Sequence, residues 1–230
     1  MKLEKVTSRA KTTSKRWYDD ACGLALALEL VGERWAPLVA RELMFGPRRF
    51  GEIKAELTGV SANVLTQRLE GLIASGIVRR RKLPSPASVQ VYELTEWGYE
   101  SRPIFEQMAV WALRSRRHDP TLPLSPAALM MSMRALFRAD MAQGLAITAG
   151  FRFDGDGFLM RIADGTITVE RADPDGADLV WNGAPNTLIR VIYGKYPIAE
   201  VASTAPLEVT GDAKLLARFI DSFALPPKVD

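Results

Sequence analysis

The sequence predicts two domains: a mainly α winged helix-turn-helix with a β-hairpin wing, followed by an α/β (α+β) domain whose sheet is rich in antiparallel strands. Three observations predict this arrangement. Two apolar-periodic helices joined by a short glycine-containing turn precede a cationic hairpin. A proline-rich stretch at residues 118–125 then interrupts the chain. Beyond it the apolar period changes from that of a helix to the period of two that is typical of strands.

The composition is that of a folded protein, and its charge is unevenly distributed. Apolar residues make up 47% and charged residues 25% of the 230 residues, which allows a core in each of two domains. Residues 1–118 hold 20 Lys and Arg against 13 Asp and Glu, a net charge of +7, and residues 119–230 hold 10 against 14, a net charge of −4. The basic half is therefore the one expected to meet a polyanion.

Cysteine usage and hydropathy predict where the protein works. Cys22 is the single cysteine, so no disulfide forms within the chain, which favours the reducing cytoplasm. The apolar run 21–28 is too short for a membrane span. Acidic residues flank it on both sides, and no small-residue cleavage site follows it, so it is not expected to be a signal peptide. The chain is expected to be cytoplasmic, with no membrane partner.

The chain is expected to begin with a flexible basic arm at 1–17 and to continue into two helices. Asp19 or Asp20 caps the first helix, which runs to about residue 31. The second helix runs from about 34 to 45 and stops at Gly46-Pro47. The side chains expected to be buried on these two helices are those of Leu24, Leu28, Val31, Trp35, Leu38, Val39 and Leu43.

A helix-turn-helix follows. A short amphipathic helix over 48–57 is joined by the turn 58–60 to a longer helix over 61–75, which Ser61 caps and Gly76 ends in the left-handed conformation. The buried stripe of the longer helix consists of Leu65, Leu69, Leu72 and Ile73. Its outer face carries Ala62, Asn63, Thr66 and Gln67. Short and amide side chains of this kind can pair with base edges, adenine in particular. Taken alone the pattern fits a solvated surface helix equally well, and the flanking segments favour a DNA-recognition helix.

Two β-prone runs, 77–82 and 89–94, predict a hairpin with the loop 83–88 at its tip. The first strand carries four consecutive cations, Arg79 to Lys82. Such a run is more often a solvated face. Directly after a helix-turn-helix it favours a wing that lies along a phosphate backbone.

A longer helix is predicted from Thr95, its cap, through about Arg117. Its apolar positions exceed what one small domain needs to cover, and they are Trp97, Ile104, Phe105, Met108, Trp111 and Ala112. Together with the first helix it is expected to form a homodimer interface. A two-fold dimer places two recognition helices about 34–36 Å apart, which predicts a palindromic operator.

These segments, in this order, closely resemble the HxlR family of winged-helix transcriptional regulators, and the stretches that carry the resemblance are 21–23, 33–35, 38–43, 46–50, 65–69 and 92–98. The resemblance covers roughly 18–116. It implies a DNA-binding and dimerisation domain, bounded here as 18–117, that binds double-stranded DNA as a homodimer, and it suggests a repressor. The DNA contacts then predicted are Arg48, Arg49, Ser61, Ala62, Asn63, Thr66, Gln67, Arg68, Arg79, Arg81, Lys82, Ser85 and Gln90.

Two of the residues in this region have alternative roles. Arg68 lies beside the buried stripe, where a structural ion pair is the alternative to a DNA contact. Some HxlR-family members sense oxidants or electrophiles through a cysteine near the start of the first helix, the region of Cys22. A helix N-terminus can lower a thiol pKa, which supports reactivity, whereas a free cysteine is more commonly a small buried hydrophobe.

The second domain is placed at 126–230, after the linker 118–125. Its first helix starts at about Pro126 and extends past Ala142, and hairpin turns are predicted around Gly155 and Gly165. The remaining elements expected are strands at 151–153, 157–162, 166–171, 178–182 and 207–209, and helices at 185–193, 197–203 and 212–223.

This order of elements resembles a sterol-carrier-protein-like domain, through the hairpins and the segments 178–183, 188–194 and 207–212. Ala205-Pro206 stands where that family usually has a glycine. The resemblance implies a pocket for an apolar small-molecule effector. Candidate lining residues are Met130, Met131, Phe137, Phe151, Phe153, Trp181, Ile189 and Phe219. Each of them, taken singly, is more often an ordinary core residue.

Catalytic chemistry is not expected. The single histidine, His118, lies in the linker. A multi-histidine metal site or a nucleophile–histidine pair is therefore not expected, and no cofactor is implied. The leading hypothesis is a ligand-responsive transcriptional regulator that is not an enzyme. One alternative is a regulator whose second domain only braces the dimer, with redox sensing at Cys22. Another is a carrier of a lipid-like ligand, or an enzyme, whose basic half is a protein-interaction module.

Overall fold

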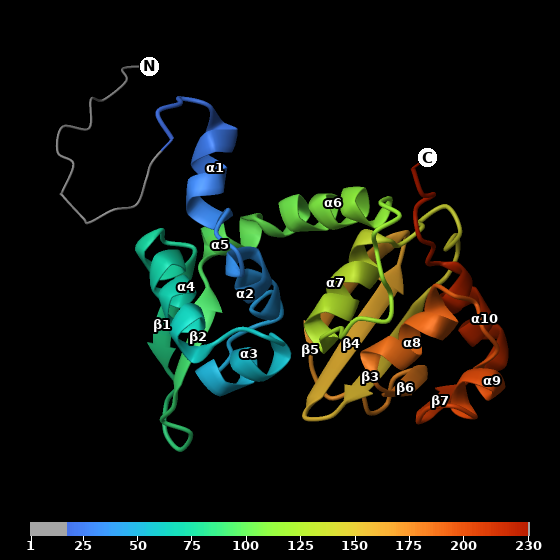
Figure 1. Ribbon diagram of the computed structural model, residues 1–230. Coiled ribbons are helices and arrows are strands. Elements are labelled where there is room, and N and C mark those ends of the chain that lie inside the picture. Colours follow the sequence, from blue (N-terminus) through green and yellow to red (C-terminus); the bar gives the residue numbers. More distant parts are fainter. Residues whose placement is uncertain (1–17, 230) are drawn as a thin grey trace.

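The computed structural model describes residues 18–229, and the predicted arm at 1–17 lies outside them. Figure 1 shows the helices and hairpin of the first half on one side of the molecule and the larger sheet on the other. This sheet has five strands. The first-half elements are α1 (Gly23–Val31), α2 (Ala36–Glu42), α3 (Phe50–Glu56), α4 (Ala62–Ala74), β1 (Val78–Lys82), β2 (Gln90–Leu94), α5 (Glu96–Glu100) and α6 (Arg102–Leu113). The second-half elements are α7 (Pro126–Ala135), β3 (Ile147–Phe153), β4 (Asp156–Ala163), β5 (Thr166–Arg171), β6 (Leu179–Gly183), α8 (Pro185–Ile192), α9 (Ile198–Ala202), β7 (Leu207–Gly211) and α10 (Ala213–Asp221).

The predicted helix-turn-helix and hairpin are confirmed. The Ser61 hydroxyl accepts a hydrogen bond from the Val64 amide at 3.2 Å and so begins α4, because it satisfies an amide that the first turn leaves free. Gly76 follows the helix with a φ of +73°, a left-handed conformation that glycine adopts without strain. Leu65, Leu69 and Leu72 are buried, as their spacing predicts. In the hairpin, β1 pairs antiparallel with β2.

The prediction of which leucines α1 and α2 bury was wrong. Leu24 and Leu28 are 67% and 46% exposed, and Leu38 on α2 is 38% exposed. The small Ala25 is buried in their place on α1. Helix α1 stands out from the body at the edge of the molecule (Figure 1), so one narrow side of it contacts the chain and the leucine side is left uncovered. The cap of α1 also differs, because Cys22 is the N-cap residue and Asp20 accepts a hydrogen bond from its amide at 2.9 Å.

Two predicted helices are shorter than expected. The single helix predicted over 96–117 is divided into α5 and α6, and Ser101 separates them. Pro103 lies in the first turn of α6, where its missing amide costs nothing, whereas it would break a continuous helix. Helix α7 ends at Ala135 and does not pass residue 142, because Phe137 leaves it to form a β-bridge with Phe223.

The second half folds around the sheet, in the strand order β5-β4-β3-β6-β7. Neighbouring strands pair antiparallel except β3 and β6, which are parallel. Both predicted hairpin turns are present, and their glycines, Gly155 and Gly165, have φ values of +76° and +69°. Strand β3 begins at Ile147, earlier than predicted. Figure 1 shows α7 and α8 on the same side of the sheet.

The two halves share one apolar core. The ring of Phe45, after α2, meets the ring of Phe158 on β4 edge-on, with centroids 5.5 Å apart. Helix α7 packs against both α2 and α6. The segment before residue 230 returns to the connection between the halves, where the Lys228 ammonium donates to the carbonyls of Leu113 and Ser115 at 2.9 and 3.0 Å. None of the described helices is both long and apolar enough to cross a membrane.

Candidate nucleic-acid interface

Helix α4 presents its predicted recognition face to solvent. Ala62, Asn63, Thr66 and Gln67 are all exposed, and Asn63 and Gln67 lie on the side of the helix opposite its buried leucines. Ser61, at the N-terminal end, is exposed as well. Because the cap at Ser61 and the leucine stripe set the rotation of the helix, the two amide side chains point away from the core. The exposure that base contacts require is present, and the contacts themselves stay a prediction.

Arg68 is held on the inner edge of that face by an ion pair. Its guanidinium lies 3.2 Å from the Glu33 carboxylate, and its side chain is 24% exposed. Its Nε atom is buried and has no hydrogen-bond partner within residues 18–229. The structural ion pair, which was the alternative to a DNA contact for Arg68, is therefore present in the fold.

The wing cations are ordered by partners on the facing strand. The Arg79 and Arg81 guanidiniums both donate to the buried carboxylate of Glu93, at 2.6 and 3.1 Å. Arg80 lies on the other face of β1, where its guanidinium is 5.6 Å from the centroid of the Tyr92 ring. Each side chain keeps its charge while losing conformational freedom, which lowers the entropy cost of contacting a phosphate.

A surface hollow lies beside the wing and is positively charged. It encloses about 450 Å³ and is lined by Arg80, Arg81, Lys82, Ser88 and Gln90. We call it the wing hollow. Three of its five residues were predicted as DNA contacts; Arg80 and Ser88 were not. The run of four cations was a signal that could have included Arg80, and no local pattern marks Ser88.

The structure corrects the expectation for Arg48. Its side chain is 10% exposed, and its guanidinium forms an ion pair with Asp156 of the second half at 2.7 Å, so it is not available to a phosphate. Arg49 beside it is exposed, and its amide donates to the Glu52 carboxylate at 2.8 Å, which begins α3. Ser85, at the wing tip, is exposed.

Carboxylates gather where Arg48 meets the second half. Burial raises the pKa of the Glu56 carboxyl above its usual value, and the nearby carboxylates of Glu42 and Asp156 raise it further. Glu42 is 2% exposed and accepts hydrogen bonds from the Arg41 guanidinium and the Ser125 hydroxyl, each at 2.8 Å. Glu42 thus ties α2 to the cap of α7.

Two helices expose apolar side chains that nothing covers within residues 18–229. On α6 they are Ile104, Met108 and Trp111, spaced so that they form one stripe, with Trp111 77% exposed. On α1 they are Leu24, Leu26 and Leu28. Cys22, the N-cap of α1, is exposed, which contradicts the buried alternative for it.

The residues predicted to line an apolar pocket lie in or beside the core of the second half. Phe151, Trp181 and Phe219 are fully buried, with ring centroids 6.1 to 6.4 Å apart. Met130, Met131 and Phe153 are buried, and Phe137 and Ile189 are half-buried. The Trp181 Nε1–H is buried and has no hydrogen-bond partner among the described residues.

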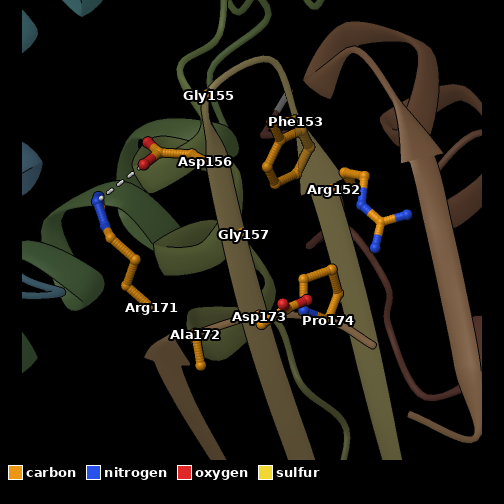
Figure 2. Close-up of a pocket in the computed structure, with 9 residues that line it drawn as sticks. All are labelled: Arg152, Phe153, Gly155, Asp156, Gly157, Arg171, Ala172, Asp173 and Pro174. Carbon is orange, nitrogen blue, oxygen red and sulfur yellow. Dashed lines mark hydrogen bonds and ion pairs between the residues drawn. The ribbon is translucent and has the colours of Figure 1, made fainter. Parts of the chain in front are cut away.

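Phe153 also lines an open hollow of about 450 Å³ at the β3–β4 turn, shown in Figure 2. The other residues lining this sheet hollow are Arg152, Gly155, Asp156, Gly157, Arg171, Ala172, Asp173 and Pro174. Asp156 and Arg171 point to one side of β4 and Arg152 to the other.

Comparison with known proteins identifies the first half. The family described as HxlR-like helix-turn-helix matches residues 30–119. The HTH-type transcriptional regulator YodB of Bacillus subtilis is 38% identical over 86 residues, which are 37% of this chain and 77% of YodB. The chain belongs to the HxlR family. It is a DNA-binding transcriptional regulator of the HxlR type. A second relative, the uncharacterized regulator YvaP of the same organism, is 36% identical over 87 residues, 37% of this chain and 80% of YvaP.

Solved structures similar to this HxlR-family chain cover less than half of it. The reduced form of YodB from B. subtilis is 35% identical and covers 43% of this chain and 98% of its own, with a TM-score of 0.39. The redox regulator HypR in its oxidized form is 29% identical and covers 42% of this chain and 100% of its own, also with a TM-score of 0.39. YodB has also been solved bound to a quinone. The family match ends at residue 119, before α7 and the sheet.

Proposed function

We propose that this HxlR-family regulator is a homodimeric repressor that binds a palindromic operator, with α4 in the major groove and the wing on the phosphate backbone. The exposed amide face of α4 carries the proposal, because Asn63 and Gln67 are exposed and their amides can pair with base edges. The wing hollow supplies the cations for the backbone. The other predicted contacts that are exposed around these two features are Arg49, Ser61, Ala62, Thr66, Arg79, Ser85 and Gln90. Arg68 is half-buried and paired with Glu33.

The exposed stripes on α1 and α6 support the homodimer. An apolar side chain as large as Trp111 is rarely left 77% exposed, and neighbouring apolar side chains on one stripe mark a protein-interaction surface. A two-fold axis through these helices gives each protomer the same surface, so that the interface is self-complementary.

Alanine at Asn63 or at Gln67 is expected to relax base preference. Each amide that pairs with adenine accounts for about 1–3 kcal/mol of discrimination, so the variant should lose about tenfold or more of its preference for the operator over a single-base variant. The measurement is equilibrium binding to an operator selected from random DNA and to single-base variants of it.

Lys82→Ala is the matched comparison. It removes a charge that lines the wing hollow, so it should weaken binding to all sequences alike and make the salt dependence shallower. Glu70→Ala, at an exposed position further along α4, is the control that should leave base preference unchanged. If Lys82→Ala changed base preference and Gln67→Ala did not, the roles assigned to helix and wing would be reversed.

For the second half, we propose a sterol-carrier-like domain, with its boundary after the 118–125 connection, that binds an apolar effector bearing a hydrogen-bond acceptor. The unpartnered Trp181 Nε1–H supports this, since a buried donor without an acceptor costs about 1–3 kcal/mol. The rings of Phe151 and Phe219 beside it would hold the apolar part of such a ligand. The Arg48–Asp156 ion pair and the Ser125–Glu42 hydrogen bond join the two halves. These contacts also favour the alternative in which the second half braces the dimer.

Mass spectrometry of an organic extract, together with a thermal-shift screen of hydrophobic acids, sterols and aromatics, tests the effector. A bound compound should raise the melting temperature of the wild-type protein and raise that of Trp181→Phe less, because the variant keeps an aromatic ring but lacks the N–H donor. If no compound co-purifies or stabilises the protein, the second half is a brace. The alternative signal is oxidation at the exposed Cys22. If oxidants change DNA binding and Cys22→Ser abolishes that change, Cys22 is the sensor.

A further inference from the structure

We propose that Asp156 is a positioning residue for DNA binding: through Arg48 it holds the wing strand β2, so that the second half of the chain sets how firmly the wing engages DNA. The inference rests on the proposed function, because it assumes that the wing contacts phosphates. It assigns a role to a contact between the halves that is separate from base reading and from effector binding.

Asp156 is fixed from the side of the second half. It begins β4, where its register partner across the hairpin is Phe153. Its side chain is 8% exposed, and Oδ1 lies 3.4 Å from the Arg171 guanidinium, the pair drawn in Figure 2. Arg171 is held in turn over the Phe158 ring, 4.8 Å from its centroid. The carboxylate therefore has little freedom to move.

Arg48 carries the contact across to the first half. Its Nη1 donates to both oxygens of Asp156, at 2.7 and 2.9 Å. Its Nε lies 3.5 Å from the Glu52 carboxylate on α3, a longer contact to a more exposed partner. Asp156 is thus the acid closest to the Arg48 guanidinium.

The backbone of Arg48 is part of the wing. Its amide donates to the Tyr92 carbonyl at 2.9 Å, and its carbonyl accepts from the Tyr92 amide at 2.8 Å, so that Arg48 extends the two-stranded sheet by one residue. Tyr92 is in the middle of β2, its register partner on β1 is Arg80, and the Arg80 guanidinium lies over its ring. Gln90, at the start of β2, donates to the Tyr92 hydroxyl at 3.3 Å. Both Arg80 and Gln90 line the wing hollow.

Two guanidiniums depend on this one carboxylate. The Nη1 atoms of Arg48 and Arg171 lie 2.7 and 3.4 Å from the same Asp156 Oδ1, so the two cations are close to each other. Burial and the charge of Arg48 lower the pKa of Arg171. Removing the negative charge of Asp156 leaves two partly buried cations facing each other. Arg48 would then move away from Arg171, and the backbone bridge to Tyr92 would move with it.

Asp156→Asn tests the proposal in the full-length protein. Binding to the selected operator is expected to weaken about tenfold, with a salt slope shallower by about one, while the preference for the operator over single-base variants stays as in the wild type. Hydroxyl-radical footprinting should show protection lost at the backbone positions that Lys82→Ala also loses. Asp175→Asn is the matched control, because Asp175 pairs with Arg152 within the second half, and it should behave as wild type.

A second variant separates positioning from a general loss of folding. Asp156→Glu keeps a carboxylate at the same contact and should keep the salt slope that Asp156→Asn reduces. If Asp156→Asn binds with the wild-type slope and footprint, or loses base preference in step with affinity, the proposal is overturned. If instead the wild-type protein shows no base preference and no salt dependence, the proposed function itself fails.

Discussion

Glutamate in place of Trp111 is expected to convert the proposed homodimer to monomers. Trp111 is the most exposed side chain of the α6 stripe, with Ile104 and Met108 beside it. A carboxylate on that stripe would lose its hydration in the dimer without gaining a partner, which is costly. Affinity for the palindromic operator should then fall by about 100-fold or more, because the second half-site is no longer bound as part of the same complex.

Analytical ultracentrifugation and operator binding check this result together. Met141→Glu is the matched control, since Met141 is also exposed, at 56%, but lies in the turn after α7 and not on α6. The control should remain dimeric and bind as the wild type does. A Trp111→Glu protein that stays dimeric at micromolar concentration would place the interface elsewhere.

The second large effect is expected from Phe158→Ala, which should lower the free energy of unfolding by about 3–5 kcal/mol. Phe158 is fully buried on β4, and its ring contacts Phe45 of the first half and Phe153 of the second. The Arg171 guanidinium also lies over it. Truncation leaves a cavity at the place where the two halves join, so helices and sheet are both expected to lose stability.

Urea unfolding followed by circular dichroism measures the change. Tyr196→Ala provides the comparison, because Tyr196 is 49% exposed and its loss is expected to cost within about 0.5 kcal/mol. If Phe158→Ala changed stability as little as Tyr196→Ala does, the shared core would not contribute to folding. If only the sheet lost stability, the two halves would fold independently.

Local patterns predicted most of the fold, because the elements are set by neighbours in sequence. The cap at Ser61, the leucine stripe and Gly76 determine the length and rotation of α4, and hence which side chains face outward. The alternating pattern and the two glycine turns likewise predicted β4 and β5 to within a residue or two. The parallel pairing of β3 with β6 has no local signal, since it depends on two segments far apart in the chain.

The incorrect predictions for Leu24, Leu28 and Arg48 share a physical cause: each assumed that a side chain's role is decided within its own element. Leu24 and Leu28 have helical spacing, but spacing does not reveal whether the chain itself or a second copy covers them. Arg48 sits among basic residues, but its partner Asp156 is 108 positions away and removes it from the surface. The exposed face of α4 was predicted correctly because its orientation depends on local contacts alone.

Selection of bound sequences from a pool of random duplex DNA by the wild-type protein tests whether a dimer reads DNA through α4. We expect an inverted repeat whose half-sites are centred about one helical turn apart, because two copies of α4 related by a dimer axis would read it. A pool without enrichment, or a single half-site with no dyad, would contradict a dimeric regulator that reads DNA through Asn63 and Gln67.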